Sequence, residues 1–180
     1  EGEKHLLYPA LEELSALIVP QDSLIDRIHR VFDDHGEVKD SASLKLSRIR
    51  TQKETVKSRI RRSFQHILQD KDMAPYLQDA IITQRNGRYV VPVKEEYRYK
   101  FSGIIHDRSS TGQTLFMEPM VSVELNNDLA EMTAAEKQEI QEILQDLTEE
   151  VKKTVEVTRN NCHLATELEF IFARAKLALS

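Results

Sequence analysis

The sequence is poor in the residues that disulfide-bonded domains and loop-rich enzymes use. It has one cysteine, Cys162, no tryptophan, and only five glycines and five prolines among 180 residues. A single cysteine excludes an internal disulfide and favours a reducing compartment. Few glycines and prolines, together with 31% charged residues, favour long helices with large surfaces over a compact enzyme core.

Long apolar runs are also missing. None approaches the roughly 18 residues that a membrane-spanning helix needs. The first residues, Glu1 to His5, lack the charged-then-apolar pattern of a signal peptide and do not begin with Met. We therefore expect a cytoplasmic chain with no membrane partner, taken from a longer protein.

Motifs for catalysis are absent as well. The glycines are isolated, so the chain has neither the GxxxxGK[ST] and GxGxxG phosphate loops nor a GxSxG nucleophile turn. The nearest group is His106-Asp107 beside Ser109 and Ser110, but neighbouring strand residues point to opposite faces. We expect these residues to support a hairpin. We expect no catalytic residue, cofactor-binding residue or metal ligand, and an isolated chain that neither hydrolyses ATP nor cuts DNA.

Helical periodicity dominates both ends of the chain. Apolar residues predict two short helices before Asp33, with Gly36 as a left-handed cap of the second. Next, Asp40, Ser41 or Ser43 caps a helix that continues to Asp72, with about 28 residues and a length on the order of 40 Å at about 1.5 Å per residue. The helical period returns at 121, and whether the last stretch, 164–179, is a separate helix stays open.

Between 78 and 119 the period changes to two, as in strands. Two β-branched runs, 81–83 and 89–93, flank Asn86-Gly87, the strongest short hairpin signal. A second pair is expected at 101–105 and 114–117, and Pro92 predicts an edge strand or a bulge. The fold class is therefore mainly α, with long antiparallel lever helices and a small four-stranded antiparallel β module at their tip. The expected divisions are 1–78, 79–119 and 120–180.

Charge is distributed unevenly around the net value of -5. Between 45 and 62, eight basic residues oppose only Glu54, whereas between 118 and 150 ten acidic residues oppose only Lys137. Pairing of the basic helix with the acidic helix returning beside it is the default interpretation. Direct contact of the basic helix with nucleic acid is the alternative.

The β module carries its own basic residues. Between 85 and 108, six basic residues oppose three acidic ones and alternate with four aromatic residues. Basic side chains neutralise phosphates, and aromatic rings pack on bases or sugars, so this pattern predicts a nucleic-acid-binding surface. The alternative is an ordinary solvated hairpin face. The six candidate residues are Arg85, Arg88, Lys94, Arg98, Lys100 and Arg108.

Several long strings resemble the second branch of the bacterial MutS-like family, MutS-two. They are Asp79 to Lys94 (DAIITQRNGRYVVPVK), Gly103 to Pro119 (GIIHDRSSTGQTLFMEP), Glu124 to Asn127 (ELNN) and Gly36 to Ser43 (GEVKDSAS). The resemblance extends over nearly the whole chain. It implies a piece of the helical core and lever region, with a small clamp-like β module at the tip.

The resemblance also implies properties of a longer parent protein. Members of that family are similar to MutS in their levers and in an ABC-type ATPase that uses ATP and magnesium, and they usually end in a Smr nuclease domain. They act as homodimers, bind branched DNA, restrain recombination, and are implicated in splitting stalled ribosomes through rRNA contacts. Neither the Walker motifs nor the nuclease domain occurs in this sequence.

Two functional hypotheses follow. In the first, the chain is a lever and clamp segment that contacts DNA or the ribosome through the β module and transmits ATP-driven motion. In the second, it is a structural helical interaction or dimerisation module, and the β module only caps the helices.

Overall fold

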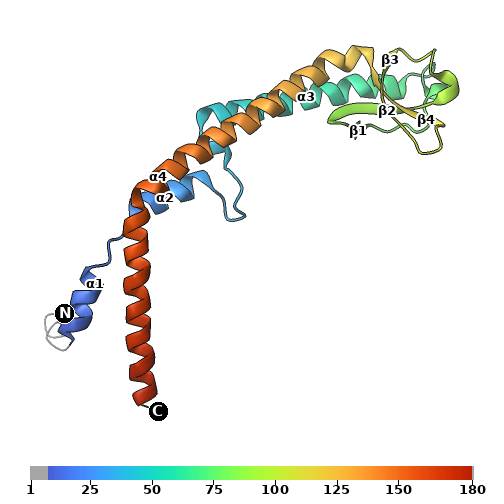
Figure 1. Cartoon of the computed structure of the whole chain (residues 1–180). Coiled ribbons are helices and arrows are strands. Elements are labelled where there is room, and N and C mark those ends of the chain that lie inside the picture. Colours follow the sequence, from blue (N-terminus) through green and yellow to red (C-terminus); the bar gives the residue numbers. More distant parts are fainter. Residues whose placement is uncertain (1–7, 180) are drawn as a thin grey trace. The chain divides into compact units, whose positions relative to one another are not determined.

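The computed structural model describes residues 8–179 and divides into two compact units. One unit comprises 40–141, and the other combines 8–39 with 142–179. Figure 1 shows the elements of both, coloured along the chain. The divisions predicted along the chain, 1–78, 79–119 and 120–180, describe sequence order and stay a prediction.

In the 40–141 unit, the basic stretch forms one long helix, as predicted. Helix α3 covers Leu44–Gln69, 26 residues, and begins at Ser43, whose hydroxyl accepts a hydrogen bond from Leu46 N at 2.9 Å. The helix ends three residues before the predicted limit. Asp70 is extended, and its carboxylate accepts a hydrogen bond from Asp72 N at 2.8 Å, which stabilises a turn instead of another helical turn.

Nine of the ten acidic residues of the acidic stretch belong to α4, Val123–Ala178, a single 56-residue helix, and the tenth, Glu118, precedes it. This answers the open question about the last helical stretch, because no separate helix begins after 160. Within the 40–141 unit, the start of α3 contacts the later part of this α4 segment: Lys45 lies 2.5 Å from Glu139, and Lys53 lies 2.5 Å from Glu136. The predicted antiparallel pairing of basic and acidic helices is therefore confirmed.

Four antiparallel strands lie between these helices, as predicted. Their order in the sheet is β1-β2-β4-β3. Asn86 and Gly87 both have positive φ, 52° and 77°, as the two-residue hairpin turn between β1 and β2 requires. Gly112 also has positive φ in the turn between β3 and β4. The strands are β1 Thr83–Arg85, β2 Arg88–Lys94, β3 Gly103–Arg108 and β4 Thr114–Pro119.

Three local predictions were wrong. Strand β2 is interior in the sheet, and Pro92 is tolerated there because β1 pairs only with Arg88 to Val90, so β1 needs no amide from Pro92. The Pro92 carbonyl accepts a hydrogen bond from Gln78 N, and the irregular register lies in β3 between Ile105 and Asp107. Phe101 precedes its strand and is a buried anchor. Gly36, with φ of 81°, lies in a turn after Phe32 has left the α2 helix, and is not its cap.

The core of this unit lies between α3, α4 and one face of the sheet. Residues Val91 and Val93 of β2 are opposite Met117 and Leu115 of β4, and all four side chains are buried against α3. Fully burying one such side chain stabilises a fold by about 1.5–3 kcal/mol. Short 3-10 turns, Asp40–Ala42, Ala74–Tyr76, Glu95–Tyr97 and Met120–Ser122, connect the main elements. The helices contribute Val56, Ile60, Phe64 and Leu129.

The second unit contains α1, Pro9–Ala16, α2, Asp22–Val31, and residues 142–178 of α4. The segment between α1 and α2 is held to α4 by Asn161, which accepts a hydrogen bond from Val19 N and donates one to Val19 O. Near the end of α4, Phe170, Phe172 and Leu177 are exposed. Within 8–179, no helix is both long and apolar enough to cross a membrane.

Candidate nucleic-acid interface

The six basic residues predicted to contact nucleic acid fall into different environments. Arg85 ends β1 and Arg88 begins β2, so both lie next to the first hairpin turn. Lys94 ends β2 and pairs across the sheet with Thr114, while Arg108 ends β3. Arg98 and Lys100 lie in the connection between β2 and β3. Their partners decide which of them are available to a ligand.

Arg88 is part of a polar cluster around a buried carboxylate. Glu118 is fully buried, and its Oε2 accepts a hydrogen bond from Arg88 Nε at 2.8 Å and lies 2.5 Å from His106 Nε2. Arg88 also donates to Asn127 Oδ1 at 2.5 Å. We call Arg88, His106, Glu118, Asn126 and Asn127 the Glu118 cluster.

Asn126 completes this cluster by joining the helix to the sheet. Its side chain accepts a hydrogen bond from Tyr89 N at 3.0 Å and donates one to Tyr89 O at 3.2 Å. Arg88 thus has a carboxylate partner on β4, Glu118, and a neutral amide partner on α4, Asn127. Its charge holds β2, β4 and the start of α4 together, and a buried carboxylate without it would be uncompensated.

Arg85 and Lys94 are partly engaged. The guanidinium of Arg85 lies 3.9 Å from the centre of the Phe116 ring and 3.1 Å from Asp107 Oδ2. Lys94 donates a hydrogen bond to Pro75 O at 3.0 Å. Both side chains remain partly accessible at the sheet surface. Asp107 and His106 thus serve different partners, Arg85 and Glu118.

Arg98, Lys100 and Arg108 have no carboxylate partner within residues 8–179. Arg98 lies over the ring of Tyr99, with its Cζ 5.0 Å from the ring centre. Lys100 Nζ lies 5.7 Å from the ring centre of Tyr97. Cations without internal partners can exchange their counterions for phosphates, so these three are the strongest candidates of the six.

Helix α3 also presents cations in two environments. On its inner side, Arg50 and Lys53 donate to the two carboxylate oxygens of Glu136, at 2.8 and 2.5 Å. Burial by itself would raise the pKa of Glu136, but hydrogen bonds from Lys53 and Arg50 outweigh it and hold that pKa below its ordinary value. The pKa of Arg50 is raised, because its hydrogen bonds to Glu136 and Asp40 outweigh the opposing effect of burial.

The outer side of α3 was not singled out by the sequence pattern. Arg48, Arg59 and Arg62 are exposed, and at about 100° per residue they fall on one stripe of the helix surface. No ion pair is formed by these three within the described part of the chain. A helical projection of the sequence could have found this stripe, because Arg50 and Lys53, which bind Glu136, fall on a different side of the helix.

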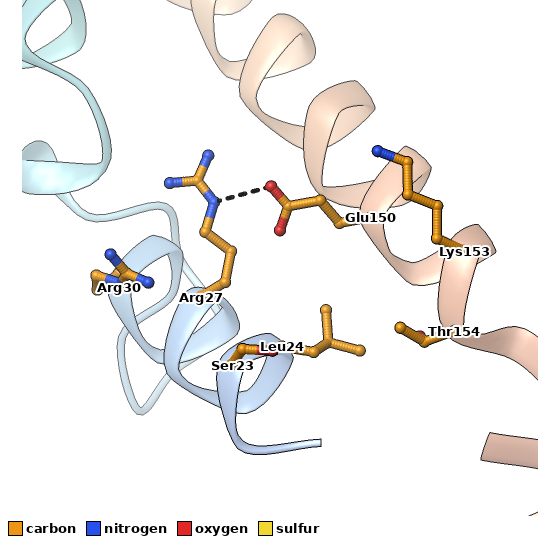
Figure 2. Close-up of a pocket in the computed structure, with 7 residues that line it drawn as sticks. All are labelled: Ser23, Leu24, Arg27, Arg30, Glu150, Lys153 and Thr154. Carbon is orange, nitrogen blue, oxygen red and sulfur yellow. Dashed lines mark ion pairs between the residues drawn. The ribbon is translucent and has the colours of Figure 1, made fainter. Parts of the chain in front are cut away.

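A separate depression of about 470 Å³ lies in the unit formed by 8–39 and 142–179. Figure 2 shows its lining residues, with Arg27 directed at Glu150, 3.6 Å away, and Leu24 between α2 and α4. The ammonium of Lys153 points away from Leu24 in this view. The cations therefore do not converge on one point, and within residues 8–179 no group of three or more His, Cys, Asp or Glu side chains could hold a metal ion.

Comparison with known proteins shows which family the chain matches. No family model matches the chain. It is 48% identical over 167 residues, 93% of its length, to a protein named Endonuclease MutS2 from Bacillus thuringiensis strain Al Hakam. The same identity extends over 170 residues of the Endonuclease MutS2 of Bacillus mycoides strain KBAB4. The chain corresponds to a segment of the MutS2 family. It spans 21% and 22% of the lengths of those two proteins.

Membership of the family confirms the resemblance drawn from the four strings. Three of these strings contain the Glu118 cluster and the hairpin turn at Asn86-Gly87, so the features that made the sequence recognisable also hold the β module together. The relatives are named endonucleases, and the described residues correspond to about a fifth of each. Which residues of this chain contact a partner is a separate question from its family.

Proposed function

We propose that this chain is the lever and clamp segment of a MutS2-type protein, and that it contacts nucleic acid through the β module. The observation that carries the proposal is the separation of the cations. Arg88, Arg50 and Lys53 are bound by internal carboxylates, whereas Arg98, Lys100 and Arg108 have none within 8–179. Such unneutralised charge attracts phosphates.

The remaining activities are assigned to the longer protein. We propose that ATP and magnesium act in a part outside these 180 residues, and that α3 and α4 transmit the resulting motion to the β module. The relatives are named endonucleases, and we place the nuclease chemistry outside this chain as well. DNA with branches and the rRNA of stalled ribosomes are the two proposed partners of the parent protein, which acts as a homodimer in the cytoplasm.

Salt-dependent binding tests the nucleic-acid contact. The chain is titrated with a four-way DNA junction and, separately, with ribosomes, between 50 and 200 mM salt. A phosphate-binding surface gives a logarithm of affinity that falls linearly with the logarithm of salt concentration, at about 0.9 per neutralised phosphate on duplex DNA. Comparison of the two ligands shows which one the β module prefers.

Two charge-matched triple variants locate the contact. Changing Arg98, Lys100 and Arg108 to Ala is expected to weaken binding and reduce the salt slope by up to about three units. Changing Arg48, Arg59 and Arg62 to Ala removes the same charge from α3 and is expected to change binding less. If the α3 set loses the affinity and the module set binds like the parent, the helix surface is the contact and the proposal fails.

A second candidate function is a helical interaction module. The exposed apolar residues near the end of α4, Phe170, Phe172 and Leu177, favour it, because exposed apolar side chains grouped on one helix are common at protein interfaces. Sedimentation velocity of the chain at increasing concentration measures the association. A dimer that forms without any salt-dependent binding to nucleic acid supports this function over the first.

A further inference from the structure

The connection between β2 and β3 holds an aromatic side chain outward on a fixed backbone. We call residues 95–101 the aromatic turn. Arg98 N donates to Glu95 O, and both Lys100 N and Phe101 N donate to Tyr97 O, at 2.9–3.1 Å. Phe101 is buried in the core, and the Tyr97 ring lies 5.0 Å from the ring of Tyr76. The turn is therefore anchored on both sides of Tyr99.

Tyr99 itself is 89% exposed, the most exposed aromatic side chain within residues 8–179. No hydrogen bond is formed by its hydroxyl within that range. Covering an exposed aromatic ring with another flat apolar surface lowers the free energy of the system. Because the turn is anchored on both sides of Tyr99, little conformational entropy is lost when a ligand binds the ring. This favours a ligand-binding role for Tyr99 over an exposed ring without a function.

Cations flank the ring on the same turn. Arg98 lies over Tyr99, and Lys100 follows it directly in the chain. Glu95 and Glu96, the carboxylates of the turn, belong to its first residues and line a separate depression with Gln78 and Gln113. A nucleotide whose base covers Tyr99 therefore has its phosphates beside two cations, with the carboxylates at the start of the turn.

We propose that the aromatic turn binds an unpaired base by stacking on Tyr99, while Arg98 and Lys100 neutralise the adjacent phosphates. This rests on the nucleic-acid contact proposed above and adds a preference to it. Bases inside a duplex have both faces covered by their neighbours, so only single-stranded, looped or displaced bases offer a free face. The module then prefers nucleic acid that contains unpaired nucleotides over a continuous duplex.

Binding of the 180-residue chain to three probes tests the preference: a 12-nucleotide oligothymidylate, the corresponding oligouridylate, and a 12-base-pair duplex. The probes are compared at equal salt concentration, at several concentrations between 50 and 200 mM. Tyr99→Ala is expected to weaken single-strand binding about 5- to 150-fold, because a base stacked on an aromatic side chain contributes about that factor. Tyr99→Phe retains the ring and is expected to bind within about twofold of the parent. Comparison of the deoxy and ribo probes separates DNA from RNA as the source of the base.

Two controls make the outcome decisive. The salt slope of Tyr99→Ala should equal that of the parent, because no cation is lost, and its affinity for the duplex should be unchanged. If Tyr99→Ala binds the single strand like the parent while the salt slope stays steep, the stacking inference is wrong and the phosphate contact stands. If the parent binds none of the probes at any salt concentration, the proposed function itself is wrong.

Discussion

The Glu118 cluster and the aromatic turn use similar residues in the same small β module for different purposes. In the cluster, Arg88 is held by Glu118 and Asn127 and is mostly removed from water. In the turn, Arg98 lies over the exposed ring of Tyr99 and has no carboxylate partner within 8–179. The number of basic residues in a segment therefore does not measure its capacity to bind phosphate. What matters is how many carboxylates the fold has already placed beside them.

The largest effect is expected where the cluster loses its cation. Arg88→Ala leaves Glu118 buried without its guanidinium partner, and breaking a buried ion pair in this way costs about 3–5 kcal/mol. Urea denaturation followed by circular dichroism measures the change. The matched variant Arg98→Ala, one side chain of the same type in the turn, should leave the midpoint almost unchanged. Equal destabilisation of both variants would remove the distinction between the two regions.

A single added methyl group probes the packing beside the cluster. A Cβ atom at Gly103 would lie 2.5 Å from the carbonyl oxygen of Glu118, so β3 and β4 would have to separate. Gly103→Ala is expected to lower the free energy of unfolding by about 1–3 kcal/mol. Ser102→Ala, at the exposed neighbouring position, is the control. A melting temperature of Gly103→Ala equal to that of Ser102→Ala would contradict the close approach of the strands.

A smaller effect, dependent on pH, is expected at Glu136 between α3 and α4. Its pKa in the folded chain lies below the ordinary 4.5, so its contribution to stability is present above that pH and is lost as pH falls through the folded pKa. Glu136→Gln is expected to lower the free energy of unfolding at pH 7 by about 1–2 kcal/mol. The parent and this variant should become more alike in stability below pH 4. Glu131→Gln, exposed on the same helix, should follow the parent at every pH.

The smallest effect on stability is expected in the aromatic turn. The double variant Arg98→Ala with Lys100→Ala removes one half-buried and one exposed cation that have no carboxylate partner in the described chain, so its free energy of unfolding should stay within about 0.5 kcal/mol of the parent. Its affinity for nucleic acid should nevertheless fall. Thermal melting and binding, measured on the same preparation, check both parts. A large loss of stability would mean that the turn supports the fold.

The elements of the fold could be predicted because local signals agree with packing. Asn86-Gly87 specifies its hairpin, Ser43 caps α3, and the change of period marks the β module. The environment of Arg88 could not be predicted, because its partners Glu118 and Asn127 are 30 and 39 residues away in the chain. Pro92 was misplaced for a similar reason: periodicity does not show that β1 stops pairing at Val90, before it reaches Pro92.

The irregular register of β3 has a consequence for how the module behaves in a crowded solution. β3 is an edge strand, and an unbroken edge can pair with strands of other chains and start aggregation. The shift between Ile105 and Asp107 disturbs the regular row of amides and carbonyls and increases the local twist. At the opposite edge, β1 has only three residues. Both edges of this sheet are therefore poor templates for strand addition. Copies of the module are then less prone to pair with one another, and the module stays free to bind its partner.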